Sequence, residues 1–125
     1  MSKYVLAIDQ GTSSTKAILF DQTFSLKSIA QQEFEQFFPY PGWVEHNPED
    51  LWNSVLATSR SVIKKSNVNS SNIVSIGITN QRETTIVWDK NTGKSIYPAI
   101  VWQDRRTSNT CELLKAENLE ELISK

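Results

Sequence analysis

The segment Ile73–Thr79 (IVSIGIT) restricts the possible folds of this chain more than any other feature. It is apolar at nearly every position, whereas a strand with one face in water alternates apolar and polar residues. The pattern therefore predicts a central strand, covered on both faces, rather than an edge strand. A strand of this kind needs packed layers on both sides of its sheet.

The residues before this strand predict a three-stranded meander. Short strands are expected over residues 4–9, 15–21 and 26–34, and two tight turns separate them. Strands with such short links pair antiparallel with their neighbours. The aromatic segment over residues 35–47 contains Pro39, Pro41 and Gly42, so it is expected to be irregular.

One amphipathic helix is predicted after this segment. Asn47 is a good N-cap residue, and Pro48 suits the first helical position. Glu49 and Asp50 place negative charge near the positive end of the helix dipole. We expect about five turns, with the apolar residues at helical spacing: Leu51, Trp52, Val55, Leu56, Val62 and Ile63.

The last third of the chain predicts two further short strands and a helical end. The strands are expected over residues 84–89 and near 97–101, with a turn at residues 90–94 between them. From Thr107 onward the apolar residues return to helical spacing.

Charge and cysteine content argue against several classes of protein. Thirteen Lys and Arg against fourteen Asp and Glu give a net charge of −1, and the basic residues are scattered. Neither a nucleic acid nor a membrane is therefore expected as a partner. The single cysteine, Cys111, allows no internal disulfide. No segment resembles a secretory signal or a membrane span, so the expected location is cytoplasmic.

The run DQGTSSTK, which starts at Asp9, is the first candidate site. It combines a glycine, four consecutive hydroxyl residues and a lysine, and the candidates among them are Gly11, Thr12, Ser13, Ser14 and Lys16. A glycine lets the backbone approach a ligand closely, and the other side chains can donate to phosphate oxygens. Asp9 is placed to hold Mg²⁺ through water. The spacing of a Walker loop is absent, and a polar hairpin that satisfies its own backbone is the alternative.

The run Asn80-Gln81-Arg82-Glu83, directly after the apolar strand, is the second candidate site. Ligands of open α/β sheets bind at the carboxyl ends of the strands. Arg82 can donate to a hydroxyl oxygen and Glu83 can accept a hydroxyl proton, so the pair suits a polyol. An ion pair at the strand end is the alternative.

Trp102, at the end of the last expected strand, is the third candidate. It could form an apolar wall for the carbon atoms of a small substrate, and ordinary core packing is the alternative. Trp43, Trp52 and Trp88 are expected to pack in the core or against loops. His46 has no Cys, His or Asp at ligand spacing, so a metal role is not expected.

Four sequence blocks occur along the chain in the order that is typical of one protein family. They are residues 7–16 (AIDQGTSSTK), 41–52 (PGWVEHNPEDLW), 76–88 (IGITNQRETTIVW) and 99–107 (AIVWQDRRT). Together they resemble the N-terminal part of the FGGY carbohydrate kinase family. Within that family, the NQRET and WQDRRT blocks are similar to those of the glycerol kinases rather than the xylulose or gluconate kinases.

The resemblance implies an α/β fold of the ribonuclease H-like, actin/hexokinase type. Its mixed sheet has flanking helices, the meander comes first, and the amphipathic helix crosses to a parallel strand. It also implies phosphorylation of glycerol to sn-glycerol 3-phosphate with ATP and Mg²⁺, in glycerol catabolism.

The resemblance assigns roles to the candidate residues by position. The phosphate would be contacted by Thr12, Ser13, Ser14 and Lys16, beside Gly11, with Asp9 near Mg²⁺. Arg82 and Glu83 would hold the glycerol hydroxyls, and Trp102 would pack on the glycerol carbons. Lys16 stands where many relatives have arginine, which keeps the charge but loses the bidentate fork.

The resemblance also implies that residues 1–125 form only the N-terminal part of the first domain. The catalytic base of the family, an aspartate, lies farther downstream, and the nucleotide-binding second domain is absent from this sequence. We therefore expect a segment that is inactive alone and that pairs with a C-terminal part or a second copy. Two alternatives remain: the N-terminal part of another FGGY sugar or polyol kinase, and a stand-alone non-catalytic binding module.

Overall fold

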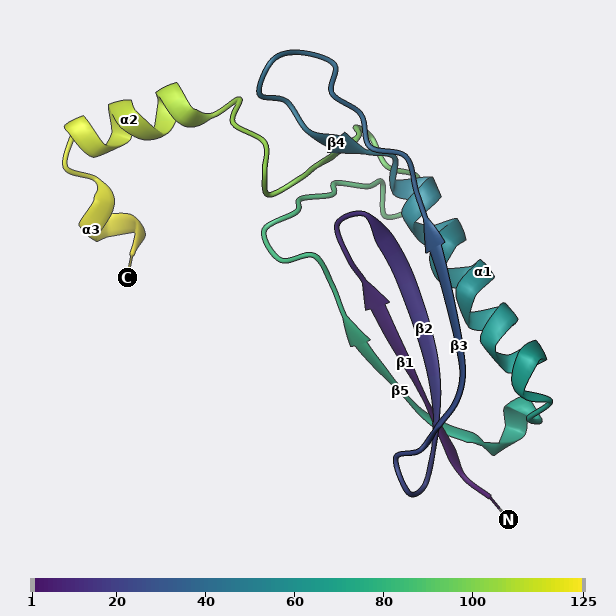
Figure 1. Ribbon diagram of the computed structural model, residues 1–125. Coiled ribbons are helices and arrows are strands. Elements are labelled where there is room, and N and C mark those ends of the chain that lie inside the picture. Colours follow the sequence, from purple (N-terminus) through teal and green to yellow (C-terminus); the bar gives the residue numbers. More distant parts are fainter. Residues whose placement is uncertain (1, 125) are drawn as a thin grey trace.

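The first three strands form the predicted antiparallel meander. The computed structural model describes residues 2–124, and its chain begins with β1 (Tyr4–Gln10), β2 (Ser14–Asp21) and β3 (Leu26–Glu33). Each strand pairs antiparallel with the next. Figure 1 shows the three strands side by side, with the connection from β3 leading up and over to the long helix.

The predicted amphipathic helix is α1 (Pro48–Ser66), which has 19 residues. Its N-terminus is capped as expected, because the Asn47 side chain accepts a hydrogen bond of 3.1 Å from the Glu49 N–H. Asn67, in a left-handed conformation, ends the helix. A short 3₁₀ turn, η1 (Ser70–Asn72), then leads into the next strand.

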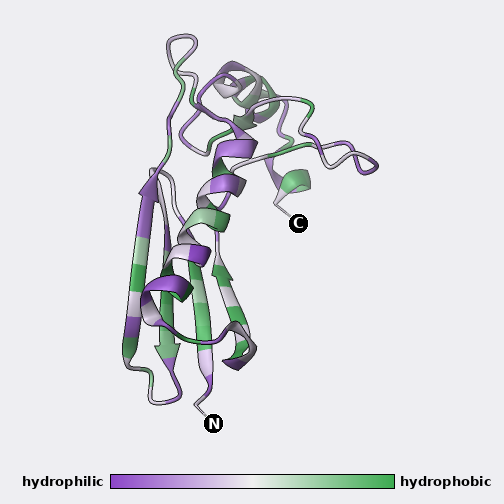
Figure 2. Cartoon of the chain, turned by 90° about the vertical axis from the view of Figure 1, so that its right-hand side faces the viewer, coloured by the Kyte–Doolittle hydropathy of each residue, from purple (hydrophilic) through white to green (hydrophobic). Residues whose placement is uncertain are grey.

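The core lies between α1 and one face of the sheet. Figure 2, in which α1 faces the viewer, shows apolar bands on the strands behind a helix whose visible turns are mostly polar. The buried helix positions are Leu51, Ser54, Thr58 and Val62. Val62 packs in one cluster with buried residues from all three meander strands: Leu6, Ile8, Ala17, Leu19 and Ala30.

The apolar strand β5 (Ile73–Thr79) lies at the edge of the four-stranded sheet, not at its centre. The strand order among the described residues is β3-β2-β1-β5, and β5 runs parallel to β1, as the family resemblance implies. Ile76 and Ile78 share a sheet face with Leu6 and Ile8, but they are 57% and 74% exposed. The expectation of a central strand covered on both faces is therefore wrong for this structure, because α1 packs mainly on β2 and β3.

A second, two-stranded sheet links two distant segments of the chain. It pairs β4 (Glu45–His46) antiparallel with β6 (Ala99–Ile100). The strand predicted over residues 84–89 is wrong, since only isolated bridges occur there, from Thr85 to Ile100 and from Trp88 to Ser95. The predicted turn at residues 90–94 is present and has Gly93 at φ +71°.

The end of the described chain is helical, as predicted. It forms α2 (Ser108–Ala116) and α3 (Glu120–Ile123), and Figure 1 shows both set apart from the sheet. No helix within residues 2–124 combines the length and hydropathy that crossing a bilayer requires.

Two of the tryptophans expected to be packed are largely exposed. Trp52 is 57% and Trp88 is 61% exposed, because Trp52 lies beside the buried stripe of α1 and Trp88 lies on the irregular segment. Trp43 does pack in a loop, where its ring lies 4.9 Å from Tyr40 and 3.7 Å from the Arg106 guanidinium.

Candidate functional site

The hairpin turn between β1 and β2, residues 10–14, is closed by a hydrogen bond of 3.0 Å from the Gly11 N–H to the Ser14 carbonyl. A Cβ atom at Gly11 would lie 3.1 Å from that carbonyl oxygen. Gly11 is not among the residues with positive φ. Glycine is therefore needed here for a close backbone approach, not for a left-handed conformation.

The side chains around the hairpin turn have different surroundings. Asp9 and Lys16 occupy directly opposed positions on β1 and β2, and the Asp9 residue is exposed. Ser14 Oγ accepts a hydrogen bond of 2.9 Å from Gln31 Nε2. Thr15, the fourth consecutive hydroxyl residue, is fully buried and contacts Ser54 Oγ at 2.6 Å. Its hydroxyl therefore belongs to the core and not to the site.

The strand-end turn, residues 81–84, follows β5. Its ends are joined by a hydrogen bond of 3.0 Å from Thr84 Oγ1 to Gln81 Oε1. Glu83 has φ +59°, a left-handed conformation that costs a non-glycine residue about 1–3 kcal/mol. Arg82 and Glu83 are exposed, and neither forms an ion pair within residues 2–124. The alternative of a strand-end ion pair is therefore wrong.

Trp102 lies between the two turns and is not a core residue. It is 54% exposed, although the preceding Val101 is 1% exposed. Its indole Nε1–H donates a hydrogen bond of 3.1 Å to Thr12 Oγ1. The ring therefore connects the last strand directly to the hairpin turn.

Residues from all three candidate sites surround one cavity of about 350 Å³. Its lining residues are Gly11, Thr12, Asn80, Gln81, Arg82, Glu83 and Trp102. The structure thus brings together five of the predicted site residues, which lie up to 91 positions apart in the sequence. The other four, Asp9, Ser13, Ser14 and Lys16, lie on or beside the hairpin turn but do not line this cavity.

Gln81 and His46 are buried polar residues to which the sequence analysis gave no role in the site. Gln81 Nε2 lies 3.3 Å from both Gln10 Oε1 and His46 Nδ1. Burial lowers the pKa of His46 below its ordinary value. The sequence signal was the pair of polar residues flanking the predicted ligand residues, Gln10 before Gly11 and Gln81 before Arg82.

Arg106 forms a buried ionic cluster that anchors this part of the chain. Its guanidinium contacts Asp104 at 2.7 Å and Glu45 at 2.9 Å. Asp104 also accepts a hydrogen bond of 2.7 Å from the Val44 N–H. The hydrogen bonds from Arg106 lower the pKa of Asp104 to about 2. The cluster fixes the segment before β4 to the segment after β6, on which Trp102 lies.

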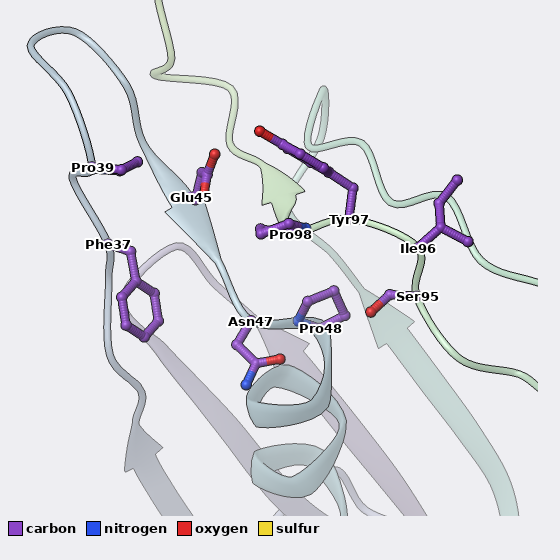
Figure 3. A pocket seen from close by; sticks show the side chains of 9 residues that line it. All are labelled: Phe37, Pro39, Glu45, Asn47, Pro48, Ser95, Ile96, Tyr97 and Pro98. Atoms are coloured by element: carbon purple, nitrogen blue, oxygen red, sulfur yellow. The ribbon is translucent and has the colours of Figure 1, made fainter.

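A second cavity, of about 480 Å³, lies away from the hairpin turn (Figure 3). Figure 3 shows it between the loop that carries Phe37, the start of α1 and the segment around Tyr97. Its two strongest polar groups already have partners, because Glu45 binds Arg106 and Asn47 caps α1. The sequence gave no indication of this cavity, and its free surface is mainly apolar.

The residues present fit a magnesium ion held mostly by water and phosphate oxygens. No group of three or more His, Cys, Asp or Glu side chains suited to a metal occurs within residues 2–124. Asp9 offers one exposed carboxylate opposite Lys16. Mg²⁺ often binds through only one or two carboxylates plus substrate phosphates, so one carboxylate is sufficient on the protein side.

Comparison with known proteins gives consistent results. A glycerol kinase of Sinorhizobium fredii is 54% identical over 125 residues, which are all of this chain and 25% of that protein. The crystal structure of Plasmodium falciparum glycerol kinase with ADP matches with a TM-score of 0.83 and 36% identity, over 91% of this chain and 23% of that one. A xylulose kinase from Rhodospirillum rubrum matches with a TM-score of 0.81 and 26% identity, over 92% and 23%.

The chain spans about a quarter of the length of these relatives. The structural neighbours are sugar kinases of the actin/hexokinase-like fold, which confirms the predicted fold class. Residues 4–125 match the N-terminal domain of the FGGY carbohydrate kinases. The family match, the identity to its members and the shared fold together show that this chain belongs to the FGGY family of carbohydrate kinases.

Proposed function

We propose that this chain is the N-terminal segment of an ATP-dependent glycerol kinase that forms sn-glycerol 3-phosphate. The observation that carries the proposal is the single cavity that joins the hairpin turn, the pair Arg82 and Glu83, and Trp102. A polyol bound in such a cavity would lie beside the proposed phosphate site, which is the geometry that phosphoryl transfer requires. The 54% identity to a protein named glycerol kinase supports the choice of glycerol.

The polyol half of the proposed site uses hydrogen bonds and one apolar surface. Arg82 donates to glycerol oxygens, and Glu83 accepts from a glycerol hydroxyl. The exposed ring of Trp102 covers the carbon atoms. Because neither charged residue is engaged in an ion pair within the described chain, both are free to bind a ligand.

The phosphate half of the proposed site is the hairpin turn. The hydroxyls of Thr12, Ser13 and Ser14 donate to phosphate oxygens, and Lys16 adds a positive charge. Gly11 keeps the backbone close enough for its neighbours to reach the ligand. The oxygen of Thr12 receives the Trp102 N–H, which leaves the Thr12 proton free to be donated.

Asp9 would hold Mg²⁺ through water, and the ion would neutralise charge on the ATP phosphates. Replacing Asp9 by Asn in the complete enzyme should raise the Mg²⁺ concentration needed for half-maximal activity and lower kcat. An unchanged magnesium response would remove Asp9 from the site.

We further propose that residues 1–125 belong to the first domain and do not phosphorylate glycerol alone. None of the residues that we assign to the site is a catalytic base, and the chain matches only a quarter of the length of its relatives. The remaining contacts to ATP would come from the rest of the protein. Such an enzyme would draw on cytoplasmic ATP, so we place it in the cytoplasm.

A chimera tests the function directly. This chain is joined to the remaining three quarters of the Sinorhizobium fredii glycerol kinase, and phosphorylation of glycerol, xylulose and gluconate is compared. We expect glycerol to be the preferred substrate by kcat/KM. Preference for xylulose or gluconate would refute the substrate, and no transfer to any of the three would refute the kinase function.

The chimera also tests the role of Arg82. A lost hydrogen bond to a charged group costs about 1.5–3 kcal/mol, so Arg82→Ala should raise the KM for glycerol roughly 10- to 150-fold. Arg60→Ala, at an exposed position of α1, is the matched control and should leave the KM unchanged. Equal KM values for the two variants would exclude Arg82 from glycerol binding.

A further inference from the structure

Gln81 is the most buried polar side chain that lines the cavity, with 7% of its surface exposed. Its amide makes three contacts with side chains from three other places in the chain. Nε2 donates to Gln10 Oε1 and to His46 Nδ1, both at 3.3 Å, and Oε1 accepts from Thr84 Oγ1 at 3.0 Å. Both amide hydrogens are therefore used, and the amide has one orientation that satisfies all three partners.

The contact with Thr84 shapes the strand-end turn. It closes the four residues that present Arg82 and Glu83 to the cavity. Glu83 is held there in a left-handed conformation, with φ +59°, which a non-glycine residue keeps only when its surroundings enforce it. The Gln81–Thr84 hydrogen bond is a direct source of that enforcement.

The contact with Gln10 connects Gln81 to the hairpin turn. Gln10 Nε2 donates a hydrogen bond of 3.0 Å to the Gly11 carbonyl, so the Gln10 side chain bridges Gln81 and the backbone of the hairpin turn. A second path returns through Trp102, whose backbone N–H lies 3.4 Å from Thr84 Oγ1 and whose indole N–H donates to Thr12. The two turns are thus joined by two hydrogen-bonded paths that both begin at Gln81.

His46 fixes the orientation of the Gln81 amide. An amide nitrogen can only donate, so His46 Nδ1 must accept and the imidazole proton lies on Nε2. His46 is fully buried, and its Nε2 has no hydrogen-bond partner within residues 2–124. The Phe34 ring packs against the imidazole with its centroid 5.1 Å away. His46 therefore stays in a tautomer and a ring position that suit Gln81 rather than its own second nitrogen.

We propose that Gln81, oriented by His46, is a positioning residue that holds the strand-end turn in register with the hairpin turn. The inference rests on the proposed function, in which these turns carry the acceptor hydroxyl and the phosphate. Gln81 itself binds neither the polyol nor the phosphate in this proposal. It sets the separation between them, and a misplacement of about 1 Å in such a site can cost 100-fold in rate.

Kinetics of the chimera test the proposal. Gln81→Leu removes all three contacts at similar volume and should raise the KM for glycerol and lower kcat, each roughly tenfold or more. His46→Phe removes the acceptor and should act in the same direction. His46→Gln restores an acceptor oxygen and should return both constants to within about threefold of the parent. The control is Thr58→Val, which removes a buried hydroxyl that bonds the Ser54 carbonyl within α1 and does not line the cavity, and which should lower Tm alone.

Hydrogen exchange of the ligand-free chimera separates this inference from the proposed function. Gln81→Leu should accelerate exchange in peptides covering both residues 10–14 and residues 80–84, whereas Thr58→Val should accelerate neither. Unchanged exchange at residues 10–14 would overturn the coupling, even if the chimera is active. Unchanged kinetic constants in Gln81→Leu, or equal defects in His46→Phe and His46→Gln, would overturn the positioning role. A chimera that phosphorylates no polyol would refute the proposed function, while the exchange data would still decide the coupling.

Discussion

Replacing Asp104 by asparagine changes one atom in the buried cluster around Arg106. Asp104 Oδ1 accepts from the Arg106 backbone N–H at 2.8 Å and from Nε at 2.9 Å. Its Oδ2 accepts from Arg106 Nη2 at 2.7 Å and from the Val44 N–H at 2.7 Å. Either orientation of an asparagine amide turns its NH₂ group toward two of these four donors. The variant must leave both without an acceptor or move the chain.

Two independent estimates indicate how far Asp104→Asn should lower the free energy of unfolding. The fall in the pKa of Asp104 from 3.8 to about 2 corresponds to roughly 2 kcal/mol of preference for the charged form. The protonated acid still accepts hydrogen bonds, whereas the amide faces two donors. Each buried donor left unpaired costs about 1–3 kcal/mol, and removing one partner of a buried ion pair costs about 3–5 kcal/mol. We expect Asp104→Asn to lower the free energy of unfolding by about 3–5 kcal/mol at pH 7.

The pH dependence has a definite sign. Because the pKa of Asp104 is lowered in the folded state, its contribution to stability is complete above pH ~4 and is lost as the pH falls toward 2. The parent protein should therefore lose this contribution between those pH values. The Asn variant has nothing to lose at this position, so the difference between the two proteins should shrink in acid.

Urea unfolding of the 125-residue chain, repeated from pH 7 to pH 2, measures both effects. If the isolated chain does not unfold cooperatively, the chimera replaces it. Asp89→Asn is the matched control, since Asp89 is exposed and holds a local turn through one oxygen that asparagine retains. It should leave the stability nearly unchanged. Equal stabilities of the two variants at pH 7, or a gap between the parent and Asp104→Asn that does not narrow in acid, would refute the reasoning.

Two further predictions follow from the hairpin turn and its support. Gly11→Ala places a Cβ 3.1 Å from the Ser14 carbonyl oxygen, so the turn must widen. We expect a lower kcat in the chimera with little change in Tm. An unchanged kcat would show that the turn accommodates the methyl group. Ser54 Oγ donates to the Leu51 carbonyl at 2.7 Å, so the Thr15 hydroxyl must donate to Ser54. Ser54→Ala leaves that buried donor unpaired and should cost about 1–3 kcal/mol, whereas Thr15→Val removes the donor itself and should cost less. Urea unfolding that gives the reverse order would contradict this assignment of donors.

The helices and strands that are determined by residues adjacent in the sequence could be predicted from it. The meander strands follow from short apolar runs with tight links, and α1 begins where Asn47 and Pro48 place it. The segment over residues 84–89 was predicted as a strand and is not one. Its β-branched and aromatic residues favour an extended backbone, but a ladder also needs a partner strand, and only single bridges form there.

The residue types of the site could be predicted from the sequence, but their arrangement in space could not. The two charged residues, the hydroxyl turn and Trp102 were recognised from their residue types, and five of the nine predicted residues line one cavity. The sequence left open whether Trp102 lines the cavity or packs in the core, and whether Arg82 and Glu83 form an ion pair. Both questions depend on exposure and on contacts with distant segments. Gln81, His46 and Arg106 received no role in the predicted site, because a polar side chain shows no sign in the sequence of whether it is buried.

The sequence by itself determined where α1 and the meander strands lie, which of their faces are apolar, and which residue types could bind a phosphate and a polyol. These properties arise from backbone hydrogen bonding and hydrophobic periodicity over a few residues. Only the tertiary structure decided that β5 lies at the edge of the described sheet and that the Trp102 indole reaches Thr12. It also decided that one buried amide joins both turns. Such contacts link residues 35 to 90 positions apart, and their energies depend on burial and on distances that no local pattern encodes.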